Sequence, residues 1–151
     1  MQSGEILVPI FGVLDESIAY QPRPAAYILI IDEQGRIAAV KGKRHYFLPG
    51  GGSLDEETPE QTVRREVREE LAREVSIIGQ IGKAIQYFCA DRQHYRMEAV
   101  FFAGGFAGEA AGIGEHELSW LEVEQIEGCV YHESHAWAVR QFTRSDRRQD
   151  V

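Results

Sequence analysis

Cysteine is scarce in this chain of 151 residues, which contains only Cys89 and Cys129. Two cysteines this far apart in sequence provide neither a disulfide framework nor a cysteine-based zinc site. We therefore expect both to be reduced thiols, as is usual in the cytoplasm.

Long apolar segments are also missing. No stretch approaches the ~18 apolar residues that a membrane helix needs. Residues 6–13 are mostly apolar, but the run is short and no lysine or arginine precedes it, so it does not fit a signal peptide. We expect no membrane partner and a cytoplasmic location.

Positive charge is in deficit, because 16 lysines and arginines face 24 aspartates and glutamates, which gives a formal charge of −8. A nucleic acid polymer is an unfavourable partner for such a chain, since its affinity comes largely from neutralised phosphates. A small phosphorylated ligand stays compatible, because a bound divalent metal inverts the local charge.

The length and a hydrophobic content of 44% fit a single domain over residues 1–151 with a sizeable core. No internal repeat or linker divides the chain. The sequence does not define the oligomeric state and is compatible with a homodimer.

The expected secondary structure is a set of strands around one well-marked helix. Pro9 places the first apolar run at a sheet edge, and the apolar run 25–31 is typical of a strand buried on both faces. Residues 32–35 predict a turn, after which residues 36–41 should return as the hairpin partner of that strand. Further strands are expected at 46–48, 75–78, 84–88, 95–102 and 116–121, a turn at 91–93, a helical turn at 122–127 and a helix at 132–143.

Two later features allow less definite predictions. Residues 104–114 contain five glycines and fit either a flexible connector or a mobile loop beside an active site. His132 and His135 lie three residues apart on the last expected helix, and we expect both on the surface.

The most informative stretch is a run of three glycines followed by a helix over residues 58–73. The glycines at 50–52 predict a turn whose backbone can approach a ligand closely. The helix start is well marked: Thr58 is a suitable N-cap, Pro59 occupies the first helical position and Gln61 completes a capping box.

Three glutamates share one face of this helix, because Glu66, Glu69 and Glu70 lie at i, i+3 and i+4. Like charges at this spacing cost a few tenths of a kcal/mol per pair, so a cation is expected to offset them. Mg²⁺ fits, because it prefers oxygen ligands and is usually held by carboxylates and substrate phosphates. The stretch therefore predicts metal-assisted hydrolysis of a phosphoanhydride.

Glu57 and Arg65 have a different predicted role. An ion pair between them would tie the loop to the helix and fix the geometry of the glutamates. The alternative is that both are ordinary solvated charges.

These residues resemble the Nudix box, whose pattern is G-x5-E-x7-R-E-U-x-E-E-x-G-U, with U a bulky aliphatic residue. The matching positions are Gly51, Glu57, Arg65, Glu66, Val67, Glu69 and Glu70. The chain departs at the end, where Ala72 and Arg73 replace the glycine and the aliphatic residue. A left-handed Ala72 would cost about 1 kcal/mol relative to glycine; otherwise the helix runs on. Val75 could supply the missing apolar anchor.

The resemblance to Nudix (MutT-like) hydrolases implies an α/β/α sandwich with a mixed β-sheet between helices. It also implies that Glu66, Glu69 and Glu70 bind Mg²⁺, or Mn²⁺ in its place, with the Gly50 carbonyl as a fourth ligand. The general base would be Glu69 or Glu66. The alternatives outside the box, as base or extra ligand, are Glu98 and Glu115.

The same resemblance implies a substrate in which a nucleoside diphosphate is linked to another group. Arg23 could contact a substrate phosphate or be a surface cation, and Tyr87 or Phe88 could stack on a base. The proline found past the box in some ADP-sugar members is absent, since the last proline is Pro59. Two other hypotheses remain: a Nudix-like domain that binds a nucleotide without turnover, and a purely structural acidic helix.

Overall fold

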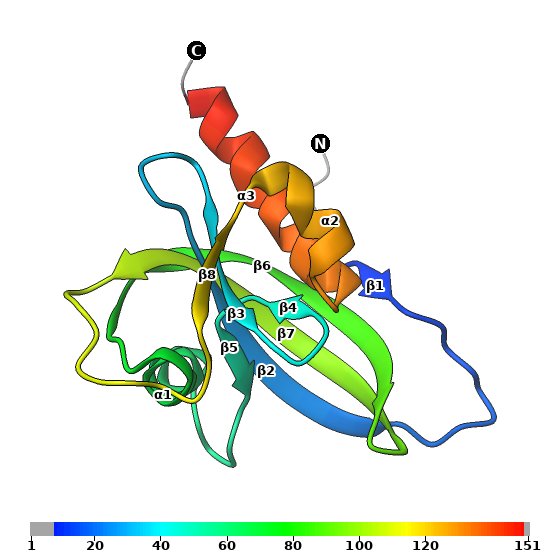
Figure 1. Ribbon diagram of the computed structural model, residues 1–151. Helices are drawn as coiled ribbons and strands as arrows, with labels where there is room; N and C mark the ends of the chain where they lie inside the picture. The colour runs from blue at the N-terminus through cyan, green and yellow to red at the C-terminus, as the bar shows by residue number, and fades with distance from the viewer. Residues whose placement is uncertain (1–7, 150–151) are drawn as a thin grey trace.

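The computed structural model describes the backbone of residues 8–149 and the side chains of residues 8–143 (Figure 1). The strands are β1 (Ile10–Phe11), β2 (Gln21–Ile30), β3 (Ile37–Lys41), β4 (Tyr46–Phe47), β5 (Gly50–Gly52), β6 (Val75–Ala90), β7 (Gln93–Phe106) and β8 (Leu118–Leu121). The helices are α1 (Pro59–Leu71), the 3-10 turn η1 (Val123–Gln125), α2 (Ile126–Cys129) and α3 (Glu133–Gln149).

A mixed five-stranded sheet in the order β1-β6-β7-β2-β5 forms the centre of the molecule. The β1/β6 and β2/β7 pairs are parallel, whereas β6/β7 and β2/β5 are antiparallel. A smaller sheet in the order β4-β3-β8 lies beside it, and α1 and α3 lie on opposite sides of the large sheet (Figure 1). The predicted mixed sheet between helices is confirmed, as is the edge position of the strand that follows Pro9.

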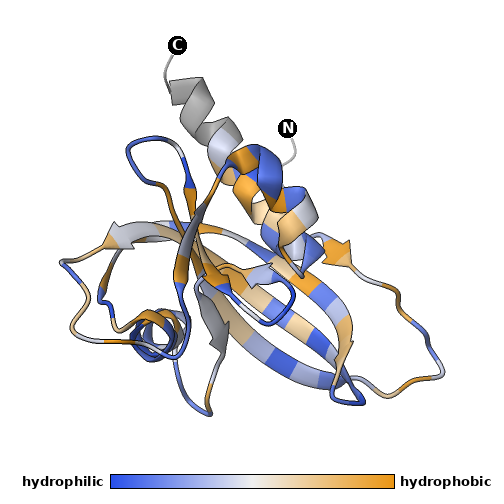
Figure 2. Cartoon of the chain, viewed as in Figure 1, coloured by the Kyte–Doolittle hydropathy of each residue, from blue (hydrophilic) through white to orange (hydrophobic). Residues whose placement is uncertain are grey.

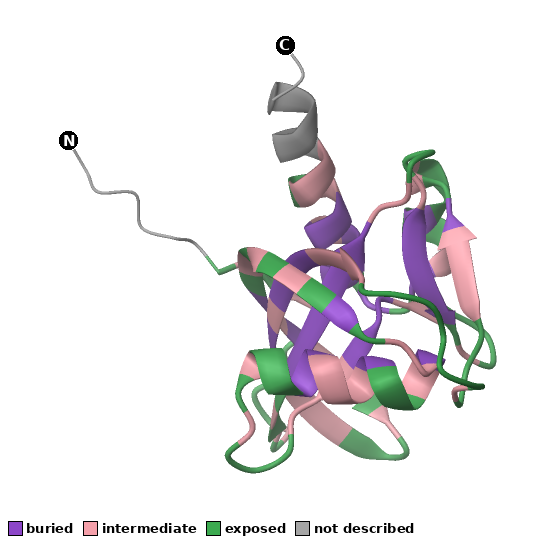
Figure 3. Cartoon of the chain, turned by 90° about the vertical axis from the view of Figure 1, so that its left-hand side faces the viewer, coloured by how far each residue is buried: buried purple, intermediate pink, exposed green. Residues whose placement is uncertain are grey.

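β2 is buried on both faces, as its apolar run predicts. Every residue from 25 to 30 is at most 5% exposed, and Figure 3 shows the buried residues gathered in the centre of the molecule. Ala25, Tyr27 and Leu29 pack in the cluster that includes α3, whereas the alternate side chains pack in the cluster that includes α1. Alternate side chains of β2 therefore contribute to two separate hydrophobic cores, one on each face of the sheet.

The predicted hairpin between residues 25–31 and 36–41 is wrong. The turn forms, with the Asp32 amide donating to the Arg36 carbonyl at 2.9 Å, but pairing stops after the single bridge between Ile31 and Ile37. The free edge of β2 is instead occupied by β5, which pairs with residues 25–27. β3 instead pairs with β4 and β8 in the smaller sheet.

The glycines at 50–52 form strand β5 rather than the predicted turn. A side chain at Gly50 would place its Cβ 2.2 Å from the carbonyl oxygen of Ala26, and the φ of Gly50 is +137°. Glycine is required here because the backbone passes so close to β2.

The start of α1 is confirmed in detail. The Gln61 amide donates to Thr58 Oγ1 at 3.2 Å, and the Thr58 amide donates to Gln61 Oε1 at 2.9 Å. The helix ends at Leu71, and Ala72 is left-handed with φ 54° and ψ 39°.

Arg73 and Val75, which follow the helix, lie in different environments. The Arg73 guanidinium lies 4.0 Å over the Phe106 ring and donates to the Gly108 carbonyl. Val75 is 3% exposed and packs with Val63 and Val67, so it provides the predicted apolar anchor.

Replacing Ala72 with glycine is expected to stabilise the fold by about 1 kcal/mol, because glycine adopts the left-handed region without the Cβ penalty. Urea unfolding of the two proteins measures the difference. Ala110→Gly is the matched control, since Ala110 is exposed and has no positive φ. A destabilised Ala72→Gly variant would contradict the assignment of strain to this cap.

The glycine-rich segment after β7 is attached to the end of α1. Residues 104–106 belong to the strand, and the following loop donates amide hydrogen bonds from Glu115 to the Glu69 carbonyl and from His116 to the Glu70 carbonyl, at 3.0 and 2.9 Å. These bonds satisfy carbonyls that a helix end leaves free.

Among residues 8–149, no helix has the length and apolar character needed to cross a bilayer.

Candidate active site

The acidic face of α1 lies against β5, and the glycines of β5 make this approach possible. The Gly50 amide donates to Glu70 Oε1 at 3.0 Å. A Cβ at Gly51 would lie 2.7 Å from the carboxyl carbon of Glu66, so any side chain there would displace this carboxylate. The strand and the helix thus hold two glutamates in fixed positions.

The predicted pair between Glu57 and Arg65 is present and is part of a larger network. Arg65 Nε donates to Glu57 Oε2 at 2.8 Å and Nη2 donates to Glu57 Oε1 at 3.0 Å. The same guanidinium donates to the Gly52 carbonyl at 2.9 Å and to Glu66 Oε1 at 2.9 Å. The hydrogen bonds from Arg65 are the main reason that the pKa of Glu57 falls to about 2. Arg65 therefore connects the loop, β5 and the acidic face of α1.

The glutamates on α1 are poorly compensated. The pKa of Glu70 is raised to about 8, mainly by burial and to a smaller extent by repulsion from Glu66, against the effect of the Gly50 amide. Burial also raises the pKa of Glu66. Glu69 is more open, with its side chain 46% exposed and 3.2 Å from Arg65.

This donor set fits a hard divalent cation. Partly desolvated carboxylates with raised pKa values gain from a nearby positive charge, and their oxygens are the ligands that Mg²⁺ prefers. In the described part of the chain, no three acidic, histidine or cysteine side chains already converge on one point, because Glu66 and Glu69 are turned toward Arg65. These two side chains would have to exchange Arg65 for the metal.

The two candidate bases outside the box lie in different surroundings. Glu115 is exposed in the loop that caps α1, and its charge contributes to the raised pKa of Glu70. Glu98 is on β7, where its side chain is 62% exposed and paired with Arg96. The strands of the large sheet carry alternating hydrophilic and hydrophobic residues (Figure 2). The structure thus brings Glu115, and not Glu98, beside Glu70.

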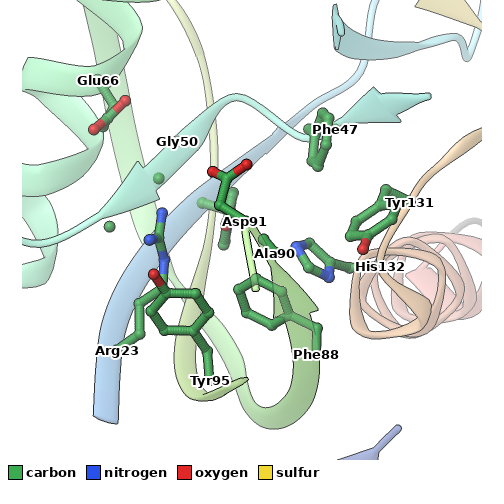
Figure 4. A pocket seen from close by; sticks show the side chains of 13 residues that line it. Arg23, Phe47, Gly50, Glu66, Phe88, Ala90, Asp91, Tyr95, Tyr131 and His132 are labelled. Carbon is green, nitrogen blue, oxygen red and sulfur yellow. The ribbon is translucent and has the colours of Figure 1, made fainter. Parts of the chain in front are cut away.

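A cavity of about 480 Å³ begins at the acidic face of α1. It is lined by Arg23, Tyr27, Phe47, Gly50, Gly51, Gly52, Glu66, Phe88, Ala90, Asp91, Tyr95, Tyr131 and His132. Arg23 and Glu66 lie toward one end, and Phe47, Tyr131 and His132 lie toward the other (Figure 4). The cavity thus has a charged end and an aromatic end.

Arg23 provides a positive charge at the charged end. Its guanidinium lies 5.6 Å over the Tyr95 ring and beside Gly52. Its Nε is buried and has no hydrogen-bond partner among the described residues, and no carboxylate of that set pairs with it. An anionic ligand would satisfy this group.

Of the two aromatic residues considered on β6, Phe88 lines the cavity. Tyr87 packs against Tyr20, with ring centroids 4.8 Å apart, since adjacent strand residues face opposite ways. The structure therefore places Phe88, rather than Tyr87, where a base could stack.

The surface position predicted for His132 and His135 is wrong, because they are 5% and 0% exposed. His135 Nδ1 accepts a hydrogen bond from the Leu48 amide at 3.2 Å, and His132 lines the cavity. The missed signal is the spacing of His132 and His135 with Ala136 and Val139, which is typical of one buried face; His132 immediately precedes α3, and the other three residues lie on it. Sequence reasoning also missed Phe47 and Tyr131.

The contribution of His132 to stability is expected to be lost as the pH drops from about 6.5 to about 4, whereas the raised pKa of Glu70 acts in the opposite direction between about pH 8 and 4.5. Burial, with repulsion from Arg23, lowers the pKa of His132 to about 4, so in this window the unfolded chain binds a proton that the folded chain does not. His132→Phe should remove about 2 kcal/mol of the loss between pH 7.5 and pH 5. Urea unfolding at both pH values measures it, with the exposed His116→Gln as control; equal pH dependence in the wild type and His132→Phe would contradict the prediction.

Comparisons with known proteins give matches over most of the chain. A family model described as the NUDIX domain matches residues 21–145. An RNA pyrophosphohydrolase from Hydrogenovibrio crunogenus is 34% identical over 142 residues, covering 74% of this chain and 85% of the relative.

Solved structures show the same fold. A MutT NUDIX hydrolase from Burkholderia pseudomallei matches with a TM-score of 0.66 and 27% identity, over 80% of this chain and 98% of that chain. A NUDIX hydrolase from Nitrosomonas europaea matches with a TM-score of 0.68 and 13% identity, over 83% and 90%.

Proposed function

This chain belongs to the Nudix hydrolase family, whose members act on pyrophosphate bonds, and we propose that it cleaves a nucleoside diphosphate linked to another group with the help of Mg²⁺. The observation that carries the proposal is the set of partly buried glutamates on α1, held against β5 and connected by Arg65 to the preceding loop. A purely structural role for α1 would not explain why it carries a buried carboxyl group, that of Glu70, with a pKa of about 8.

In this proposal Glu66, Glu69 and Glu70 hold the metal, with the Gly50 carbonyl as a further ligand and Mn²⁺ as a substitute ion. When bound, the ion would neutralise charge on the phosphates and make a water molecule more acidic. Arg23 would bind a phosphate oxygen, because it lines the same cavity as Glu66 and its Nε has no hydrogen-bond partner among the described residues.

Glu69 is the best-placed general base. Its carboxylate is half exposed, and its contacts with Arg65 are the longest in the network, at 3.2 and 3.3 Å. It can therefore turn toward a water molecule more easily than Glu70. Glu66 and Glu115 are the next candidates by position, and Glu98 is the most remote.

The test is a substrate panel with and without Mg²⁺, in which the nucleotide products are separated by anion-exchange chromatography and released phosphate and pyrophosphate are also measured. It contains nucleoside triphosphates, nucleotide sugars, dinucleoside polyphosphates and a 5′-triphosphorylated RNA oligonucleotide, the last because one relative is an RNA pyrophosphohydrolase. Mg²⁺-dependent cleavage of at least one of these supports the proposal. Tight binding without cleavage of any of them would favour a non-catalytic nucleotide-binding domain.

A further inference from the structure

His135 is a fully buried polar side chain on α3 to which the proposed chemistry gives no role. It is 0% exposed, and its ring packs against Tyr27 and Phe101, with centroids at 4.2 and 5.9 Å. Its Nε2 is buried and has no hydrogen-bond partner among the described residues. An apolar side chain would fill this site without burying a polar nitrogen, so packing alone does not explain the histidine.

The other ring nitrogen makes a hydrogen bond that an apolar side chain could not replace. Nδ1 accepts from the Leu48 amide at 3.2 Å, although the two residues are 87 positions apart in the chain. Leu48 is 0% exposed and lies between β4 and β5, outside both strands. Without an acceptor from α3, a buried backbone amide would lose its partner.

Leu48 leads directly to Gly50, and each residue of this short stretch is held by a different element. The Pro49 carbonyl accepts from the Ile28 amide of β2 at 2.9 Å, and the Gly50 amide donates to Glu70 of α1 at 3.0 Å. α3 makes the third attachment, through its histidine. The position of the Gly50 peptide thus depends on three elements that are distant in sequence.

Tyr27 gives His135 a second contact with the surroundings of Gly50. The sheet register places Tyr27 opposite Gly50, and a Cβ on this glycine would lie 2.9 Å from Tyr27 Cδ1. The imidazole lies edge-on to the same tyrosine ring. A change in the imidazole would therefore reach Gly50 both along the backbone and through the ring of Tyr27.

We propose that His135 is a positioning residue for the metal site: its bond to the Leu48 amide fixes the Gly50 peptide, and this peptide in turn orients Glu70. The inference rests on the proposed function, from which it takes the roles of the Gly50 carbonyl and of Glu70. It adds that α3 helps to set the geometry of the acidic face of α1, although the two helices lie on opposite sides of the large sheet (Figure 1). Groups that orient metal ligands through a hydrogen bond affect metal affinity.

The test is Mn²⁺ binding by variants of His135, measured by electron paramagnetic resonance on folded, metal-free protein, so that it does not depend on turnover. His135→Phe keeps a buried ring without an acceptor, and we expect its Mn²⁺ dissociation constant to be at least about tenfold higher than that of the wild type. His135→Asn keeps an acceptor, because Oδ1 lies close to the place of Nδ1. It should bind Mn²⁺ within about threefold of the wild type.

Val139→Ala is the matched control, since Val139 is a buried residue of the same helix and core and its side chain cannot accept a hydrogen bond. It should destabilise the fold by leaving a cavity and change Mn²⁺ affinity by less than about twofold. The ¹H–¹⁵N NMR signal of the Gly50 amide in metal-free protein is the second readout. It should shift in His135→Phe and stay close to the wild-type position in Val139→Ala.

The proposal would be overturned if folded His135→Phe bound Mn²⁺ as tightly as the wild type, or if Val139→Ala weakened binding equally. A His135→Asn variant as weak as His135→Phe would also overturn it, because packing would then account for the effect. In the wild type, a nitrogen–nitrogen scalar coupling between the Leu48 amide and Nδ1 tests the bond without any substitution, and its absence would contradict the proposal.

Failure of the proposed function would look different. The wild type itself would then not bind Mn²⁺, whereas the Gly50 amide signal would still respond to His135→Phe and not to Val139→Ala. An unshifted Gly50 signal in folded His135→Phe would reject the positioning role whether or not the wild type binds Mn²⁺.

Discussion

Glu70→Gln is expected to lower Mg²⁺-dependent turnover by at least about 100-fold without unfolding the protein. Glutamine has the shape of glutamate and its Oε1 can still accept the hydrogen bond from the Gly50 amide, so the packing of α1 on β5 is retained. What is lost is a negative charge that a cation would otherwise bind.

The stability of Glu70→Gln separates this account from a structural role. Because burial raises the pKa of Glu70 to about 8, the metal-free carboxyl group is largely protonated at pH 7, and its neutral amide analogue should cost little stability. Glu74→Gln is the control, since Glu74 is exposed and paired with Arg68 beyond the end of α1. Full activity in Glu70→Gln would contradict the role given to this carboxylate.

Arg65→Lys is expected to have the second largest effect. The guanidinium donates to both oxygens of Glu57, to the Gly52 carbonyl and to Glu66, and a lysine ammonium cannot reproduce this planar arrangement. We expect a loss of about 1–3 kcal/mol in unfolding free energy, because acceptors are left unpaired. We also expect kcat/KM to fall by about 10–100-fold, because the glutamates lose their support.

Urea unfolding and steady-state kinetics measure both losses. Arg68→Lys is the matched control: Arg68 lies on the same helix, is more exposed and makes one ion pair, with Glu74, which is worth little at a surface. Equal effects of the two substitutions would show that Arg65 has no special role in positioning the site.

The parts of the molecule that the sequence predicted are those fixed by short-range spacing. The capping box of Thr58 and Gln61 depends on residues three apart, and the shared face of Glu66, Glu69 and Glu70 follows from helical geometry alone. The network between Glu57 and Arg65 was also accessible, because the resemblance to the Nudix box placed both residues in one unit.

The incorrect predictions concern competition between distant segments. A hairpin after Ile31 was reasonable locally, but β5 occupies the edge of β2 that β3 would need, and no local pattern reveals that competition. The single strand β6 was expected as two pieces because residues 79–83 interrupt the apolar pattern; its pairing with β7 shifts register there. Tertiary pairing decided both cases.

The aromatic end of the cavity was missed for another reason. Its residues come from β4, β6 and the segment just before α3, which meet only in the folded chain. His132 was assigned to the surface by its polarity, although its spacing with His135 and Ala136 predicts a buried face. A polar residue at a position that belongs to a predicted apolar helix face is therefore a candidate for a binding-site residue.

Binding of Mn²⁺ to the metal-free protein, followed by electron paramagnetic resonance, shows whether the glutamates of α1 hold a divalent cation, because free and bound Mn²⁺ are distinguished without a substrate. The account predicts saturable binding by the wild type, at least about tenfold weaker binding by Glu66→Gln and Glu70→Gln, and unchanged binding by Glu74→Gln. It would be contradicted if all four proteins bound Mn²⁺ equally, or if the wild type did not bind it in the presence of a nucleotide that it cleaves.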